Sequence, residues 1–116
     1  MERFHVSNPY YNYIRFGLKN AEGRGGDSRM VRDVNVGDII ELYNSPDDKY
    51  ENKISSFLVR IVNKIKFDSI MEMLERMGYK NMIPDATDIT KAKDEYKQKH
   101  IRDESKGVYA FVMELA

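Results

Sequence analysis

The alternation of apolar and polar positions predicts about five strands in this chain. In the fourth of them, Phe57, Val59 and Ile61 share one face, and the opposite face is also largely apolar near its middle. A strand that is apolar on both faces is typical of a barrel wall covered by helices. The predicted strands are Arg3–Val6, Leu18–Arg24, Ile39–Tyr43, Ile54 to about Lys66, and Val108–Leu115.

A helix is predicted near the N-terminus. The run Ser7-Asn8-Pro9 joins two capping residues to a proline that suits the first helical position, so the helix covers about Pro9–Phe16. Its helical spacing turns one side toward the core. On that spacing the rings of Tyr10 and Tyr13 point inward, and Tyr11 is the freer ring.

Two further helices are predicted in the second half of the chain. Ser69 and Glu72 form a capping box that begins one helix, and Gly78 ends it. The other helix covers about Asp88–His100 and is rich in charged residues, so we expect it to lie exposed on the surface. His100 suits the dipole at the C-terminus of this helix.

The predicted order of elements is β-α-β-β-β-α-α-β, with a polar loop at Asn44–Lys53. About five strands and two to three helices in this order favour an α+β fold built on a small mixed or antiparallel barrel. A Rossmann-type fold fits poorly, because the chain has no G-x-G-x-x-G and its strands and helices do not alternate regularly. With 116 residues, we expect residues 1–116 to form a single domain.

The composition excludes several classes of protein. The 19 Lys and Arg residues balance the 19 Asp and Glu residues, so no basic field covers the whole chain. There is no Cys and there are only two His, so we expect no disulfide, no metal site and no cofactor. The longest apolar run, Val108–Met113, is far too short for a membrane span, and no targeting segment is visible. We therefore expect a soluble intracellular protein of the cytoplasm or nucleus, with no membrane partner.

One segment departs from the balance of charge. Between Ile14 and Arg32 five basic residues stand against two acidic ones. Within this segment Lys19 supplies a mobile cation, and Arg24 supplies a planar fork that binds phosphate or a base edge. Glu22 supplies a carboxylate that orients the fork or accepts a hydrogen bond from a base amino group. A plain ladder of ion pairs on a strand would explain the same three residues.

The ordered motifs of this chain resemble the activating signal cointegrator homology (ASCH) domain. The resemblance rests first on G-x-K-x-x-E-x-R, matched by Gly17, Lys19, Glu22 and Arg24. It implies a barrel similar to the pseudouridine synthase and archaeosine transglycosylase (PUA) domain, with a cleft between barrel and helices that carries this motif. Further motifs follow in order along nearly the whole chain, matched by Gly37, Asp38, Ile40, Val59, Ile61, Phe67, Ser69, Ile70, Tyr96, Gly107, Val108 and Ala110.

The resemblance also implies a function on RNA, on DNA or on modified nucleosides. Some similar bacterial domains are amidohydrolases of N4-acetylated cytidine, which use a Lys, a Thr three residues later and a more distant Glu. Lys19 matches that Lys, but Glu22 stands at the Thr position, and no Glu lies at Met77–Tyr79, where the third residue is expected. Two of the three catalytic roles are unfilled, so we expect binding rather than this reaction.

We therefore predict that the chain binds RNA, single-stranded nucleic acid or a nucleotide-like small molecule. Two alternatives stay open. One is an enzyme, either a nucleoside amidohydrolase or a weak metal-assisted ribonuclease, in which Lys19 and Glu22 perform acid–base chemistry. The other is a protein-interaction module built on the Tyr- and Met-rich surfaces. The predicted ligand-contacting residues are Lys19, Glu22, Arg24, Arg15, Arg29, Arg32, Asn8 and Tyr11.

Overall fold

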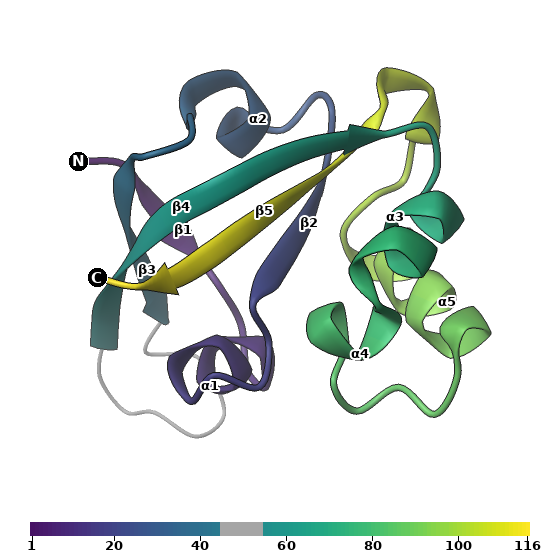
Figure 1. Cartoon of the computed structure of the whole chain (residues 1–116), viewed down its shortest axis with the longest axis horizontal. Helices are drawn as coiled ribbons and strands as arrows, with labels where there is room; N and C mark the ends of the chain where they lie inside the picture. Colours follow the sequence, from purple (N-terminus) through teal and green to yellow (C-terminus); the bar gives the residue numbers. More distant parts are fainter. Residues whose placement is uncertain (45–54) are drawn as a thin grey trace.

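A curled five-stranded sheet forms the centre of the structure, a computed structural model that describes residues 1–44 and 55–116. Neighbouring strands are antiparallel except the first and third, which run parallel. The sheet curls into a half-barrel, which confirms the predicted α+β fold with a barrel of about five strands (Figure 1). In spatial order the strands are β1 (Arg3–His5), β3 (Ile39–Asn44), β4 (Ser55–Phe67), β5 (Val108–Leu115) and β2 (Ala21–Gly25).

The predicted loop at Asn44–Lys53 falls largely outside the described residues. Asn44 itself ends β3. The predicted first residue of the fourth strand, Ile54, also lies outside the described residues, and β4 is described from Ser55.

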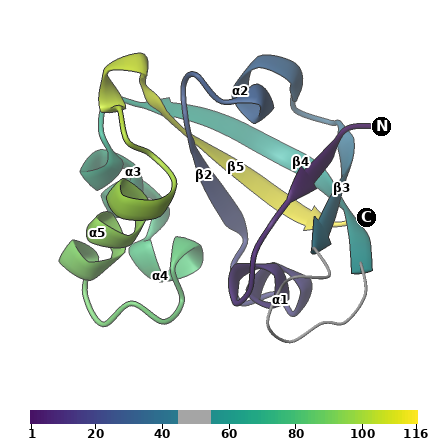
Figure 2. The same ribbon diagram turned by 180° about the vertical axis from the view of Figure 1, so that it is seen from behind.

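Helices lie at both ends of the half-barrel and beside β2. The first helix covers one end and the second covers the other, whereas the remaining three gather next to β2, as Figures 1 and 2 show. The sequence pattern predicts α1, α3 and α5 but misses α2 and α4, because four or five residues are too few to show a helical period. In chain order the helices are α1 (Tyr10–Arg15), α2 (Arg29–Asp33), α3 (Ile70–Met77), α4 (Tyr79–Met82), α5 (Ile89–Lys99) and a short 3-10 helix over Glu104–Lys106.

α1 packs against its surroundings on two sides. Tyr10 faces α5, where its hydroxyl donates a hydrogen bond to Glu95. Tyr11 is only 1% exposed, because its ring packs edge-on against Phe57 and its hydroxyl accepts a hydrogen bond from Ser55. The prediction that Tyr11 is the freer ring is therefore wrong. The helix closes one end of the half-barrel, so two adjacent rings contact neighbours on different sides of it.

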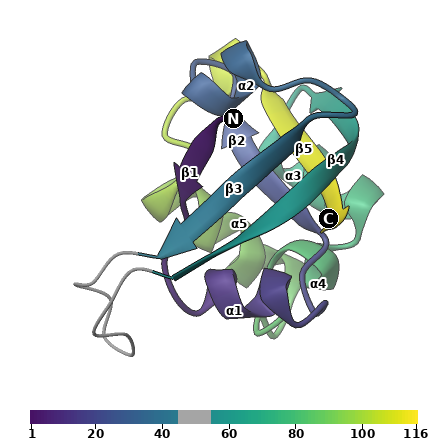
Figure 3. The same cartoon turned by 90° about the vertical axis from the view of Figure 1, so that its left-hand side faces the viewer.

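The outer face of β4 is open to solvent. Val59 and Ile61 are fully buried on the inner face, but Leu58 and Val62 on the outer face are 39% and 47% exposed. Figure 3 shows β3 and β4 with no described helix in front of them. The prediction that this strand is a barrel wall covered by helices is therefore wrong for its outer face, because α3, α4 and α5 gather next to β2. No helix in the described parts of the chain is long and apolar enough to cross a membrane.

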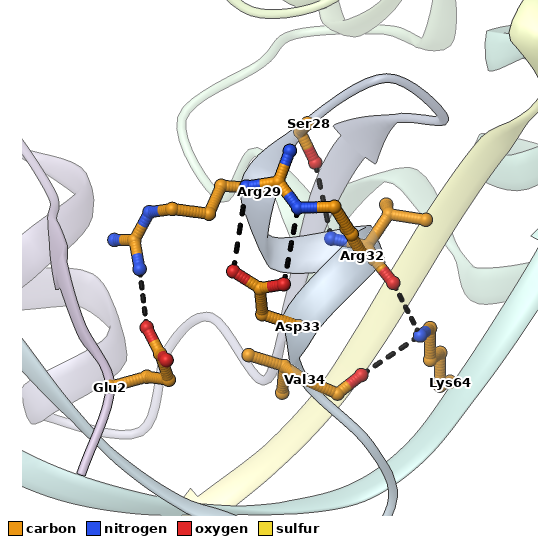
Figure 4. A network of polar contacts seen from close by, with 8 residues as sticks. Glu2, Ser28, Arg29, Arg32, Asp33, Val34 and Lys64 are labelled. Atoms are coloured by element: carbon orange, nitrogen blue, oxygen red, sulfur yellow. Dashed lines mark hydrogen bonds and ion pairs between the residues drawn. The ribbon is translucent and has the colours of Figure 1, made fainter.

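Basic side chains fasten α2 to the sheet (Figure 4). Arg29 pairs with Glu2 and also donates a hydrogen bond to the carbonyl oxygen of Arg3, on the side of β1 that has no neighbouring strand. Lys64 of β4 donates to the carbonyl oxygen of Val34, directly after α2, at 2.8 Å. The Lys64 bond satisfies a carbonyl group at the end of the helix, and together these contacts hold α2 over the half-barrel.

Replacing Gly23 with Ala tests how closely the helices pack against β2. A Cβ at Gly23 would stand 2.9 Å from Met73 Cε and 2.9 Å from Tyr96 Cε1, and both of these side chains are fully buried. We expect Gly23→Ala to lower the free energy of unfolding by about 1–3 kcal/mol in urea denaturation. Gly25→Ala is the control and should cost less, because its nearest contact, Asp27 Oδ1, is 3.2 Å away. Equal losses in the two variants would contradict close packing at Gly23.

Candidate functional site

β2 is an edge strand, and side chains take the place of its missing neighbour. Asn20 accepts a backbone hydrogen bond from β5 at 2.9 Å, so the alternation of an antiparallel ladder turns the backbone groups of Ala21 and Gly23 toward the free edge. There the Ala21 carbonyl oxygen accepts a hydrogen bond from Lys19 Nζ at 2.8 Å. The Gly23 N–H donates to Glu22 Oε1 at 3.0 Å. The two motif residues therefore complete the edge of the sheet.

Lys19 is a buried cross-link between β2 and the helices. It is 1% exposed. Besides its bond to Ala21, its Nζ donates to the carbonyl oxygen of Met82 at 2.5 Å and to the Tyr96 hydroxyl at 3.1 Å. An ammonium group has three donors, and all three of these acceptors are protein atoms. Lys19 thus joins the strand to α4 and α5 and has no donor left for a ligand.

Glu22 lies between two cations. Its Oε1 is 3.6 Å from Lys19 Nζ, and its Oε2 is 3.7 Å from Arg24 Nη2, so both contacts are ion pairs longer than a hydrogen bond. Arg24 is partly exposed, and its buried Nε has no hydrogen-bond partner among the residues that the structure describes. Arg24 therefore keeps donors that no neighbouring group uses.

Burial and the ion pairs shift the pKa values of this group. Burial lowers the pKa of Lys19, and the nearby Glu22 offsets only part of that effect. For Glu22, burial raises the pKa, but the charges of Lys19 and Arg24 act against it, and the net pKa is lower than usual. Glu22 is therefore ionised at neutral pH.

Three aromatic side chains surround the Lys19–Glu22 pair. Lys19 Nζ lies 5.8 Å from the ring centroid of Tyr10 and 5.7 Å from that of Tyr96. The His100 ring is edge-on to both tyrosines, with centroids 5.7 Å apart in each case. Burial lowers the pKa of His100, although Glu22 acts in the opposite direction, so its imidazole is neutral at neutral pH. The cluster joins residues of α1, β2 and α5 with the residue that ends α5.

A pocket of about 530 Å³ opens beside this cluster, between α1 and the segment that includes α5. Tyr10 forms part of its wall, whereas Lys19, Glu22 and Arg24 do not line it. The Tyr10 hydroxyl donates to Glu95, which also pairs with Lys99 at 2.8 Å. The charged residues that line the pocket are Asp85, Asp94, Glu95, Lys91 and Lys99.

The structure brings Lys19, Glu22 and Arg24 together but separates them from the other predicted basic contacts. Arg15 is exposed at the end of α1. Arg29 and Arg32 belong to α2 at the other end of the half-barrel, where each pairs with a carboxylate (Figure 4). The basic segment of the sequence is therefore not one continuous surface.

The two remaining predicted contact residues lie inside the packed end of the half-barrel. The side-chain amide of Asn8 is buried and has no hydrogen-bond partner within the described part of the chain. Tyr11 is in the core and offers no ring face to a ligand. In residues 1–44 and 55–116, no group of three or more His, Asp or Glu side chains is placed to hold a metal ion.

Sequence reasoning missed Tyr10, Glu95 and His100 as members of the site. Tyr10 and Glu95 are 85 positions apart, and they meet only because α5 docks against α1. The position of His100 directly after a charged helix indicates a dipole interaction, and nothing in the sequence places its ring between two tyrosines. Tyr96 is the one aromatic residue of the cluster that the ordered motifs include.

Comparisons with known proteins support the fold. The chain is similar to a solved structure described as hypothetical protein PH0355, with a TM-score of 0.79, 27% sequence identity and coverage of 100% of both chains. It is also similar to protein PF0455 from Pyrococcus furiosus, with a TM-score of 0.73, 23% identity and coverage of 98% of this chain and 96% of that one. No protein-family model and no curated protein matches the chain. The shared fold is consistent with a PUA-like half-barrel.

Substitution of Lys19 tests its role as a cross-link. Lys19→Met leaves Glu22 buried without its principal counterion and removes the bonds to two helices, so we expect a loss of about 3–5 kcal/mol in the free energy of unfolding. Urea denaturation measures this loss. Lys99→Met is the matched control, because Lys99 pairs with Glu95 at the surface, and its loss should stay below about 1 kcal/mol. Similar losses in the two variants would contradict the cross-link.

The ion pairs of Glu22 should make stability depend on pH. Because its pKa is lower in the folded protein than in the unfolded chain, its ionised form stabilises the fold above the unfolded value of about 4.3. That stabilisation is lost as the pH falls through the folded pKa. We expect the stability difference between wild type and Glu22→Gln to shrink from about pH 6 to below about pH 4. The exposed Glu75→Gln variant is measured in parallel as the control. A stability difference for Glu22→Gln that does not change over this pH range would contradict the ionised pair.

Proposed function

We propose that the chain is an ASCH-type domain that binds a nucleoside-sized ligand in the pocket between α1 and α5, either as a free molecule or as the exposed base of an RNA strand. One observation carries the proposal: a pocket of about 530 Å³ has Tyr10 in its wall, and Lys19 Nζ, which pairs with Glu22, lies 5.8 Å from the centroid of that ring. Pockets for small ligands usually measure about 300–1,000 Å³. The resemblance implies a cleft between barrel and helices that carries the motif, whereas this pocket lies between α1 and the segment that includes α5 and adjoins the motif only through Tyr10.

The charged residues that line the pocket favour binding of a base over binding of a chain of phosphates. Asp85, Asp94 and Glu95 supply three carboxylates, against only two ammonium groups in the lining. Carboxylates accept hydrogen bonds from the exocyclic amino groups of bases. The surplus of negative charge opposes a run of backbone phosphates across the pocket, so we expect recognition of one base at a time.

An amidohydrolase is the second candidate, favoured by the buried Lys19 beside Glu22. Burial lowers the pKa of Lys19, which is the direction that acid–base chemistry by a lysine requires. However, its Nζ already donates to Ala21, Met82 and Tyr96, and the side chain is closed to solvent. A substrate could reach it only if the helices moved away from β2, so binding is the better supported function.

Isothermal titration calorimetry with the four ribonucleosides, N4-acetylcytidine and a short single-stranded RNA tests both candidates. We expect at least one ligand to bind. Glu95→Gln should weaken binding by about tenfold, because it removes a carboxylate from the pocket beside Tyr10. Glu75→Gln, an exposed α3 substitution outside the pocket, is the control and should bind like the wild type.

The possible outcomes separate the candidates. Binding of nucleosides supports a free ligand, and binding of the RNA alone supports an exposed base. Release of acetate from N4-acetylcytidine would favour the amidohydrolase. A folded wild type that binds none of these ligands, or a Glu95→Gln variant with unchanged affinity, would overturn the binding proposal for this pocket.

A further inference from the structure

Arg24 differs from its two motif partners in having both solvent contact and unused donors. Its side chain is 25% exposed, whereas those of Lys19 and Glu22 are 1% and 8% exposed. Within the described residues its buried Nε has no hydrogen-bond partner. The carboxylate oxygen paired with it, Glu22 Oε2, is 3.7 Å from Nη2, which is too far for a hydrogen bond. The guanidinium therefore lacks acceptors that fit its donors.

The charges in the cluster also leave Arg24 without a full counterion. Lys19 and Glu22 form one pair, and Glu95 forms a separate pair with Lys99. The His100 imidazole is neutral, because burial lowers its pKa. Partly buried charges are normally paired and hydrogen-bonded, so the surplus positive charge at Arg24 favours an anionic group from outside the described residues.

A short series of contacts connects Arg24 to the pocket. Arg24 Nη2 is 3.7 Å from Glu22 Oε2, and Glu22 Oε1 is 3.6 Å from Lys19 Nζ. Lys19 Nζ in turn lies 5.8 Å from the ring centroid of Tyr10, which lines the pocket. Along this path the charge changes sign, from the acidic pocket lining to a guanidinium that shares its one carboxylate with Lys19. A nucleotide has a matching polarity, with amino groups on many of its bases and a negative charge on its phosphate.

We infer that Arg24 binds a phosphate of the ligand, so that the ligand is a nucleotide, or an RNA base with its adjoining phosphate, rather than a nucleoside. The inference rests on the proposed function, because it places the base in the adjoining pocket. Guanidinium donors form a planar fork that matches two phosphate oxygens. Lys19 takes no part in this contact, because its donors are already used inside the protein.

Paired calorimetric titrations test the inference. Each nucleoside is compared with its 5′- and 3′-monophosphates, and inorganic phosphate is titrated alone. We expect one monophosphate to bind about tenfold more tightly than its nucleoside, as charge-assisted hydrogen bonds to phosphate should provide. Arg24→Met should bring the two affinities close together, and Arg24→Lys should keep only part of the difference because it retains the charge without the fork. Arg76→Met, an exposed substitution on α3, should keep the full difference.

The outcomes distinguish this inference from the proposed function. Nucleosides and monophosphates that bind equally well to the wild type would overturn the role of Arg24 and leave the nucleoside pocket standing. A phosphate preference that persists in both Arg24 variants would also overturn it. No binding by any of these ligands would overturn both. Dinucleotides with and without a terminal phosphate show whether the phosphate comes from a free nucleotide or from an RNA strand.

Discussion

The open edges of the half-barrel are the constraint on which the rest of this structure depends. A sheet that does not close leaves unpaired backbone groups on β1 and β2, and a buried polar group without a partner costs about 1–3 kcal/mol. Arg29 meets this need at β1 by binding the Arg3 carbonyl oxygen. Lys19 and Glu22 meet it at β2. Because Lys19 also binds α4 and α5, the same contacts that complete the strand edge fix the position of the helices beside it.

The motif G-x-K-x-x-E-x-R thus divides into residues that shape the fold and one that faces outward. Gly17 follows α1 with a φ of +82°, a conformation that favours glycine, and the chain then turns toward β2. Lys19 and Glu22 are buried at the strand edge, and Arg24 remains partly exposed with free donors. Within the motif the single carboxylate of Glu22 faces two cations, and Arg24 is the cation that also reaches solvent.

The pocket follows from the same docking of helices against the half-barrel. α5 meets α1 through Tyr10 and Glu95, and the space between these helices becomes the pocket. Arg29 of α2 serves another purpose, because it and Lys64 of β4 hold that helix against the sheet. Selective binding by a small site therefore suits this molecule better than attraction by an extended basic surface. The similar structures share this architecture over their whole length, and at 27% and 23% identity they bear on the fold.

The sequence by itself determined the strands, the three longer helices and the grouping of Lys19, Glu22 and Arg24, because these depend on spacing along a short stretch of chain. Tertiary structure alone decided that Lys19 is buried, that Tyr11 is in the core and that His100 lies between Tyr10 and Tyr96. Exposure and long-range contacts depend on which helix docks on which strand, and a local pattern of residues does not contain that information.

The outer face of β4 shows the same limit. Its apolar side chains predicted a covering layer of helices, but three helices pack instead at the edge of β2, where Lys19 binds both the strand backbone and α4 and α5. The local sequence does not contain this choice between two packing sites.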